Sequence, residues 1–177
     1  MSLVERRYAE ALADIADHAG ELDSFGRELR EVVELFGKQA ELRLFLADPG
    51  VGAGPKKEIL KKVFSGRVKA EILNFLMLLI DKGRIDRLPG IYTEYEKEAD
   101  RRKKVLNITI VSAMPLRETQ INEIKEIFKN KYGASSVKEH IEIDKTLLGG
   151  VKVIVGDKVF DGTVKGRLEG LREVLLT

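Results

Sequence analysis

A glycine-rich loop is the first segment whose residue types and spacing suggest chemistry. Three glycines alternate with other residues over 50–54 and are followed by Lys56 and Lys57. Such a loop binds phosphate groups when it joins a strand to a helix and ends in lysine followed by serine or threonine. Here the preceding residues have helical periodicity, Pro55 has no amide hydrogen to donate, and Glu58 stands where the hydroxyl is required. We therefore interpret the loop as a flexible connection rather than a nucleotide site.

Residue types that bind metals or attack substrates are scarce in this chain. His18 and His140 are its two histidines, they lie far apart in the sequence, and neither has an obvious carboxylate partner. A zinc site needs several donors that converge. The absence of cysteine excludes disulfides, thiolate metal sites and thiol catalysis. The many Asp and Glu residues fall on polar helix faces, and no serine-nucleophile motif is present, so we expect no catalytic residue, no cofactor and no bound metal.

Four consecutive basic residues at 101–104 are of the kind that contacts nucleic acid or anionic lipid. Cations at the end of a helix are also favoured by the helix dipole, by about 0.3–1 kcal/mol each. The chain has 31 Lys and Arg against 29 Asp and Glu, and this net charge of +2 argues against a dedicated nucleic-acid binder. A two-domain nucleic-acid-binding protein is the alternative interpretation. It would need aromatic residues on its strands for base stacking, and Phe160 is the only one.

The overall composition is that of a globular protein. Its 177 residues, of which 44% are hydrophobic, suffice for one large domain or two small ones. The most apolar stretch, Ile72 to Ile80, is much shorter than the ~20 residues that cross a bilayer. The first residues carry charges where a signal peptide would need an apolar segment. We expect a soluble, cytoplasmic protein that does not insert into a membrane directly.

Helical periodicity dominates the first part of the chain. It predicts helices over residues 4–19, 22–36, 42–46, 55–64, 69–82 and 88 to about 104. Ser2 and Glu5 have the spacing of a capping box before the first helix, and Pro55 is expected as the first residue of the fourth. The fifth helix is apolar on nearly every side, which is typical of the central helix of a bundle. We therefore predict an antiparallel bundle of about six helices.

Near Lys104 the period of the apolar residues changes from helical to alternating. Strands are predicted over 106–111, 137–143 and 151–155, with a helix from Pro115 to Gly133 between the first two, an extension of the pairing at 159–160, and a last helix after Thr163. Gly149 and Gly150 form the turn into the third strand, where a positive φ angle would make a larger residue strained. The predicted fold class is α+β, with a helical bundle at 1–104 followed by a small β-α-β-β-α domain at 105–177.

The first helix has more apolar surface than one bundle-facing stripe requires. Small and apolar side chains lie on more than one of its sides: Tyr8, Ala9, Ala11, Leu12, Ala13, Ile15 and Ala16. These residues either pack entirely within the bundle or leave a groove in which a partner helix binds, which is a common mode of recognition. The residues alone leave both interpretations open.

Several segments, in order along nearly the whole chain, resemble the ATP synthase delta subunit family, which includes the mitochondrial oligomycin-sensitivity-conferring protein. In the first two thirds of the chain these are RYAEAL at 7–12, FLADP at 45–49, NFL at 74–76, KGR at 82–84 and VSAMPL at 111–116. The strongest match comprises IDK at 143–145, LGGV at 148–151, GD at 156–157, and DGT at 161–163 with Arg167, Leu168 and Leu171. Ile154, where the family often carries a polar or basic residue, and the glycine-dense loop depart from the pattern.

The resemblance implies a non-catalytic connector, or stator, of the peripheral stalk. In this family a helical N-terminal domain holds N-terminal helices of the alpha subunits on the catalytic head. A C-terminal domain engages the b subunits of the stalk, on the cytoplasmic side of the cell membrane. The connector keeps the head from turning with the rotor during proton-driven ATP synthesis. The resemblance places the recognition groove between the first and fifth helices and gives it these residues: Tyr8, Ala11, Leu12 and Ile15, facing Phe75 and Leu79.

Overall fold

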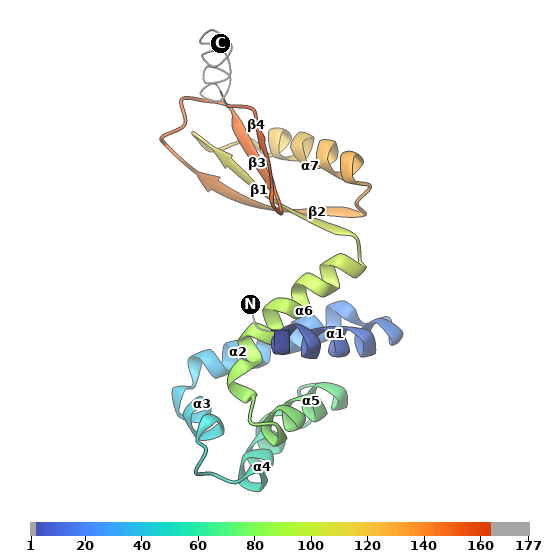
Figure 1. Ribbon diagram of the computed structural model, residues 1–177, viewed down its shortest axis with the longest axis vertical. Coiled ribbons are helices and arrows are strands. Elements are labelled where there is room, and N and C mark those ends of the chain that lie inside the picture. Colours follow the sequence, from blue (N-terminus) through green and yellow to red (C-terminus); the bar gives the residue numbers. More distant parts are fainter. Residues whose placement is uncertain (1–2, 164–177) are drawn as a thin grey trace. The chain divides into compact units, whose positions relative to one another are not determined.

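The computed structural model describes residues 3–163, and the chain divides into two compact units, Met1–Ala99 and Asp100–Thr177. Figure 1 labels the elements of both units in chain order. The boundary expected from the sequence, Lys104, lies between the end of the sixth helix at Arg102 and the start of the first strand at Val105. The predicted last helix and the predicted cap at Ser2 lie outside the described residues.

The first unit is built from α-helices, as predicted. They are α1 (Leu3–His18), α2 (Leu22–Lys38), α3 (Ala40–Ala47), α4 (Ala53–Phe64), α5 (Ala70–Asp81) and α6 (Leu88–Arg102), with a short 3-10 helix, η1 (Ile85–Arg87), before α6. The start of α4 differs from the prediction, because Pro55 is its third residue and not its first. The first four amides of a helix have no partner within the helix, so proline is tolerated throughout the first turn.

Helix α5 contributes to the core of the helical unit, but the prediction that neighbours surround it was wrong, because Leu78 on one of its faces is 43% exposed. Five of its residues are buried: Ile72, Phe75, Leu76, Leu79 and Ile80. The first helix meets the core through small side chains, since Ala9, Ala13 and Ala16 are all buried. Side chains this small let two helices approach closely without creating a cavity. Tyr95 of α6 is also fully buried, and its hydroxyl donates a hydrogen bond to the backbone carbonyl of Leu22 at 2.9 Å.

The second unit contains a mixed four-stranded sheet with one helix in its β-α-β crossover, which confirms the predicted α+β class. Its elements are β1 (Val105–Ser112), α7 (Glu118–Tyr132), β2 (Ser136–Ile143), β3 (Val151–Val155) and β4 (Lys158–Asp161). The strand order is β2-β1-β3-β4, in which β1 and β2 are parallel and the other two pairs are antiparallel. The predicted extension at 159–160 is the fourth strand.

The sequence predicted the end of the crossover helix α7 correctly, but not its start. Gly133 ends α7 in the left-handed conformation, with φ at 61°, as predicted. The start was wrong, because Pro115 precedes the helix and α7 begins at Glu118. The side chain of Gln120 accepts a hydrogen bond from the backbone amide of Arg117 at 3.1 Å, and this contact stabilises the first turn there.

The turn before β3 depends on two glycines with positive φ angles, 149° at Gly149 and 83° at Gly150. A Cβ atom on Gly150 would lie 2.5 Å from the carbonyl oxygen of Gly162 and 2.8 Å from the Cα of Thr163. That backbone is itself fixed, because the Gly162 amide donates to the Val151 carbonyl at 2.9 Å. The hydroxyl and amide of Thr163 both donate to Asp161 Oδ1, which lowers the pKa of Asp161. The neighbouring segment therefore cannot move away easily.

We predict that Gly150→Ala destabilises the second unit more than Gly156→Ala does. Gly156 also has a positive φ, 57°, but open space surrounds the position of its Cβ. The control, Gly156→Ala, should therefore lower the free energy of unfolding only by the backbone strain, about 1–2 kcal/mol. Gly150→Ala should lower it by about 1–3 kcal/mol more, because its Cβ clashes with the backbone. Urea denaturation followed by circular dichroism measures both. Equal losses of stability would contradict the close approach at Gly150.

Candidate functional site

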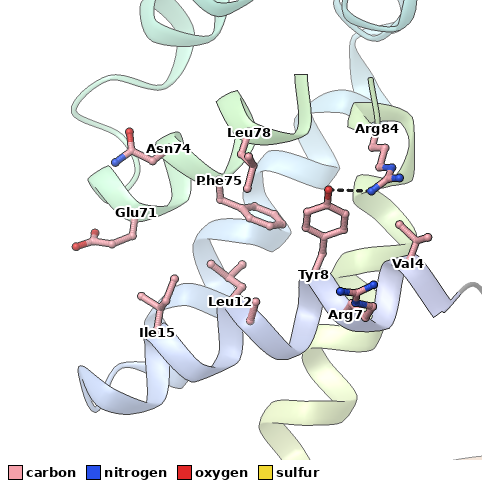
Figure 2. Close-up of a pocket in the computed structure, with 11 residues that line it drawn as sticks. Val4, Arg7, Tyr8, Leu12, Ile15, Glu71, Asn74, Phe75, Leu78 and Arg84 are labelled. Atoms are coloured by element: carbon pink, nitrogen blue, oxygen red, sulfur yellow. Dashed lines mark hydrogen bonds between the residues drawn. The ribbon is translucent and has the colours of Figure 1, made fainter. Parts of the chain in front are cut away.

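A groove of about 620 Å³ lies between α1 and α5 on the surface of the helical unit (Figure 2). Its lining residues come from these two helices and from the segment that follows α5: Val4, Arg7, Tyr8, Ala11, Leu12, Ile15, Glu71, Asn74, Phe75, Leu78 and Arg84. On each helix the lining residues are three or four positions apart, so each set forms one continuous stripe. The groove therefore follows from the periodicity of two helices.

The base of the groove is apolar and its upper edges are partly exposed. Leu12 and Phe75 form the base and are 1% and 8% exposed, whereas Ile15 and Leu78 at the edges are 49% and 43% exposed. Tyr8 packs edge-to-face against Phe75, with 6.2 Å between the ring centroids. Exposed apolar side chains arranged in one groove are typical of a surface that binds a partner.

Five of the six residues expected in the groove line it, and one does not. Tyr8, Ala11, Leu12, Ile15 and Phe75 are brought together there. The placement of Leu79 was wrong, since its side chain is 0% exposed and belongs to the core of the helical unit, while Leu78 lines the groove. The periodicity explains the error: residues 71, 74, 75 and 78 share one face of α5, and position 79 is turned about 100° from position 78, toward the bundle.

Polar residues at the rim of the groove were not identified from the sequence. Arg84 donates a hydrogen bond from Nη1 to the Tyr8 hydroxyl at 3.0 Å, and its guanidinium carbon lies 5.7 Å from the centre of the Tyr8 ring (Figure 2). Arg7 and Glu71 lie four positions before Ala11 and Phe75, so helical periodicity was a sufficient signal for both. No local pattern places Arg84 beside Tyr8, because the contact joins distant parts of the chain.

Residues of the glycine-rich loop and His18, which the sequence suggested as possible sites of chemistry, contact other groups of the same chain. Gly50 donates its amide to Asp48 Oδ1 at 2.8 Å, and Lys56 Nζ donates to the Asp48 carbonyl at 2.6 Å, which occupies polar groups of the glycine-rich loop. His18 Nδ1 lies 2.7 Å from the Asp14 carbonyl on its own helix. Among residues 3–163 no group of His, Asp and Glu is arranged to hold a metal ion. No helix in the same range is long and apolar enough to cross a bilayer.

Comparisons with known proteins point to one family. The sequence profile of the ATP synthase delta (OSCP) subunit family matches residues 4–175. ATP synthase subunit delta of Acetivibrio thermocellus is 47% identical over 176 residues, which cover 99% of each chain. A chain of the Toxoplasma gondii mitochondrial ATP synthase hexamer shares the fold, with a TM-score of 0.65 at 24% identity over 100% of this chain and 99% of that chain. A chain in a Polytomella F-ATP synthase structure of the F1 head and rotor has a TM-score of 0.52 at 27% identity, over 57% of this chain and 91% of that one.

The neighbouring leucines of α5 should respond very differently to truncation. Leu79→Ala removes a fully buried side chain and should lower the free energy of unfolding by about 2–5 kcal/mol. Leu78→Ala shortens a side chain at the edge of the groove and should cost less than about 1 kcal/mol. Urea denaturation of the two variants provides the measurement. Similar losses in both would place Leu78 in the core as well and would contradict the assignment of the two faces.

Proposed function

The chain belongs to the ATP synthase delta (OSCP) subunit family, and we propose that its α1–α5 groove holds an N-terminal helix of the alpha subunit. Membership makes it a non-catalytic component of the peripheral stalk of an F-type ATP synthase, a membrane-associated complex. We further propose that the second unit engages the b subunits and that the protein acts on the cytoplasmic side of the cell membrane. The alternative of a nucleic-acid-binding protein is left without support.

The proposal rests on the exposed apolar residues of α1 that line the groove, such as Ala11 and Ile15. The buried alanines of α1 lie on another side of the helix. From Val4 to Ile15 the lining of α1 spans about three helical turns, or roughly 17 Å. A helix of similar length would cover the exposed parts of Ile15 and Leu78 and contact Leu12 and Phe75 below them. Binding of an amphipathic helix in an apolar groove is a mode in which side chains at helical spacing act as anchors.

The proposed role is mechanical. A rotating shaft inside the catalytic head exerts torque on it, so the head must be tied to the stationary stalk. In this proposal the residues up to Lys104 bind the catalytic head, and the residues from Val105 onward bind the stalk. Because the attachments act in series, loss of either one breaks the connection and leaves the catalytic sites of the head untouched.

Substitution of Ala11 by tryptophan tests the groove. Ala11 is exposed in the free protein and lines the groove, so Ala11→Trp should leave the fold intact and fill space that the bound helix needs. Overpacking costs about 1–3 kcal/mol, which corresponds to about 5- to 150-fold weaker binding. Isothermal titration with a synthetic peptide from the alpha-subunit N-terminus measures the change.

The matched control is Ala40→Trp, which adds the same side chain to an exposed alanine at the start of α3, outside the groove. It should bind the peptide like the unchanged protein. Unfolding of the Ala11→Trp variant in circular dichroism would place Ala11 in the bundle core. Unchanged affinity in a folded Ala11→Trp variant would remove the peptide from this groove.

Truncation tests the division of labour. A protein ending at Lys104 keeps every α-helix of the first unit, including α6, and should still co-sediment with the isolated catalytic head. Added to membranes that lack this subunit, it should fail to restore proton-driven ATP synthesis, while ATP hydrolysis by the free head continues. The full-length protein is the positive control. Full coupled synthesis with the truncated protein would rule out the series arrangement.

A further inference from the structure

The rim of the groove carries opposite charges at its two ends. Arg7 and Arg84 lie with Val4 at one end, and Glu71 lies with Asn74 at the other, as Figure 2 shows. The two helices run in opposite directions along the groove, because Val4 of α1 is at the end where Arg84 follows α5. The charges therefore mark the ends of the groove rather than its sides.

The charges at the rim are available to a partner. Arg7 and Glu71 are both exposed, and neither takes part in an ion pair or hydrogen bond within the part of the chain that the structure describes. Neighbouring cations differ in this respect, since Arg6 pairs with Glu10 at 2.8 Å and Arg87 contacts a carboxylate oxygen of Glu5 at 3.4 Å. An unpaired cation and an unpaired anion at opposite ends of one apolar groove favour a ligand with the complementary charges.

Arg84 is held in position before any partner binds. Its hydrogen bond to the Tyr8 hydroxyl and its place over the Tyr8 ring fix the guanidinium at the end of the groove. A guanidinium has five N–H donors, so one hydrogen bond to Tyr8 leaves others for a carboxylate. A donor that is already fixed loses little conformational entropy when it binds.

We propose that the groove selects the direction of its occupant by charge, and this inference rests on the proposed function. The occupant is an amphipathic helix with carboxylates in its first turn and a Lys or Arg in its last turn. Its first turn lies against Arg7 and Arg84, its last turn lies against Glu71, and the helix runs parallel to α1. The opposite direction brings like charges together at both ends.

The arrangement of charges in the occupant follows from helix physics. Acidic residues stabilise the first turn of a helix and basic residues stabilise the last turn. Two helices of this chain have that arrangement, with Asp23 and Lys38 in α2 and with Glu118 and Lys131 in α7. The backbone dipole of the occupant favours the other direction, but it amounts to about half a charge at each end and acts only near the ends. Full side-chain charges in direct contact outweigh it.

Site-directed disulfide trapping tests the direction, and the absence of cysteine from the chain makes each introduced thiol unique. The variants are Val4→Cys at the arginine end and Asn74→Cys at the glutamate end. The probe is a synthetic peptide of about fourteen residues with Glu in its first turn, Lys in its last turn, leucines on one face and an N-terminal cysteine. Val4→Cys should form the mixed disulfide about tenfold more readily than Asn74→Cys at low salt, and added salt should reduce this preference.

Charge exchange provides the matched control. With Arg7→Glu and Glu71→Lys together, the preference for Val4→Cys should disappear or reverse. The pair Arg6→Glu and Glu41→Lys makes the same exchange on α1 and in the first turn of another helix, α3, outside the groove, and should leave the preference unchanged. Equal trapping at both ends of the unexchanged groove, or a preference for Asn74→Cys, would overturn the inference and leave the groove as a helix-binding site. No trapping at either end, together with no binding of the alpha-subunit peptide, would instead overturn the proposed function.

Discussion

The close packing of α1 against the bundle is the interaction on which the rest of the helical unit depends. Ala9, Ala13 and Ala16 are buried on one side of α1, and the groove-lining residues lie on the other. Alanine buries little area, so this contact contributes less hydrophobic free energy than a leucine stripe would. Its effect is geometric, because small side chains let the backbone of α1 pack closely against the bundle, including α2, and leave larger side chains at the groove. The helix therefore packs into the core with one side and lines the groove with another.

The sequence predicted most of the architecture because its signals are local. The change from helical to alternating period, the apolar character of α5 and the glycine at the end of α7 each depend on residues a few positions apart. The positions of Pro55 and Pro115 were wrong for the same reason, since proline favours the start of a helix without fixing it at one position. At α7 the helix start coincides with the hydrogen bond between Gln120 and Arg117 instead.

The site was harder to predict than the fold, and Leu78 and Leu79 show why. A helix that is apolar on nearly every side has no polar face to mark its orientation, so its sequence does not say which residues face the core. The structure assigns the two leucines to different surfaces by a rotation of about 100°. Arg84 was missed for another reason: its hydrogen bond to Tyr8 spans 76 positions in the chain, and such a contact exists only after the helices have packed.

A connector under torque needs a slow rate of dissociation more than it needs chemistry, and the proposed role of the groove is consistent with that need. Apolar contacts at its base, such as those of Leu12 and Phe75, are shielded from salt and control how long a bound helix stays. Charges at an exposed rim contribute little affinity, but they speed association and penalise a wrong orientation. A groove with an apolar base alone would accept a helix in either direction. In the proposed arrangement, opposite charges at its two ends give it a direction, and a fixed direction would let a partner helix transmit force to the rest of the complex along one path.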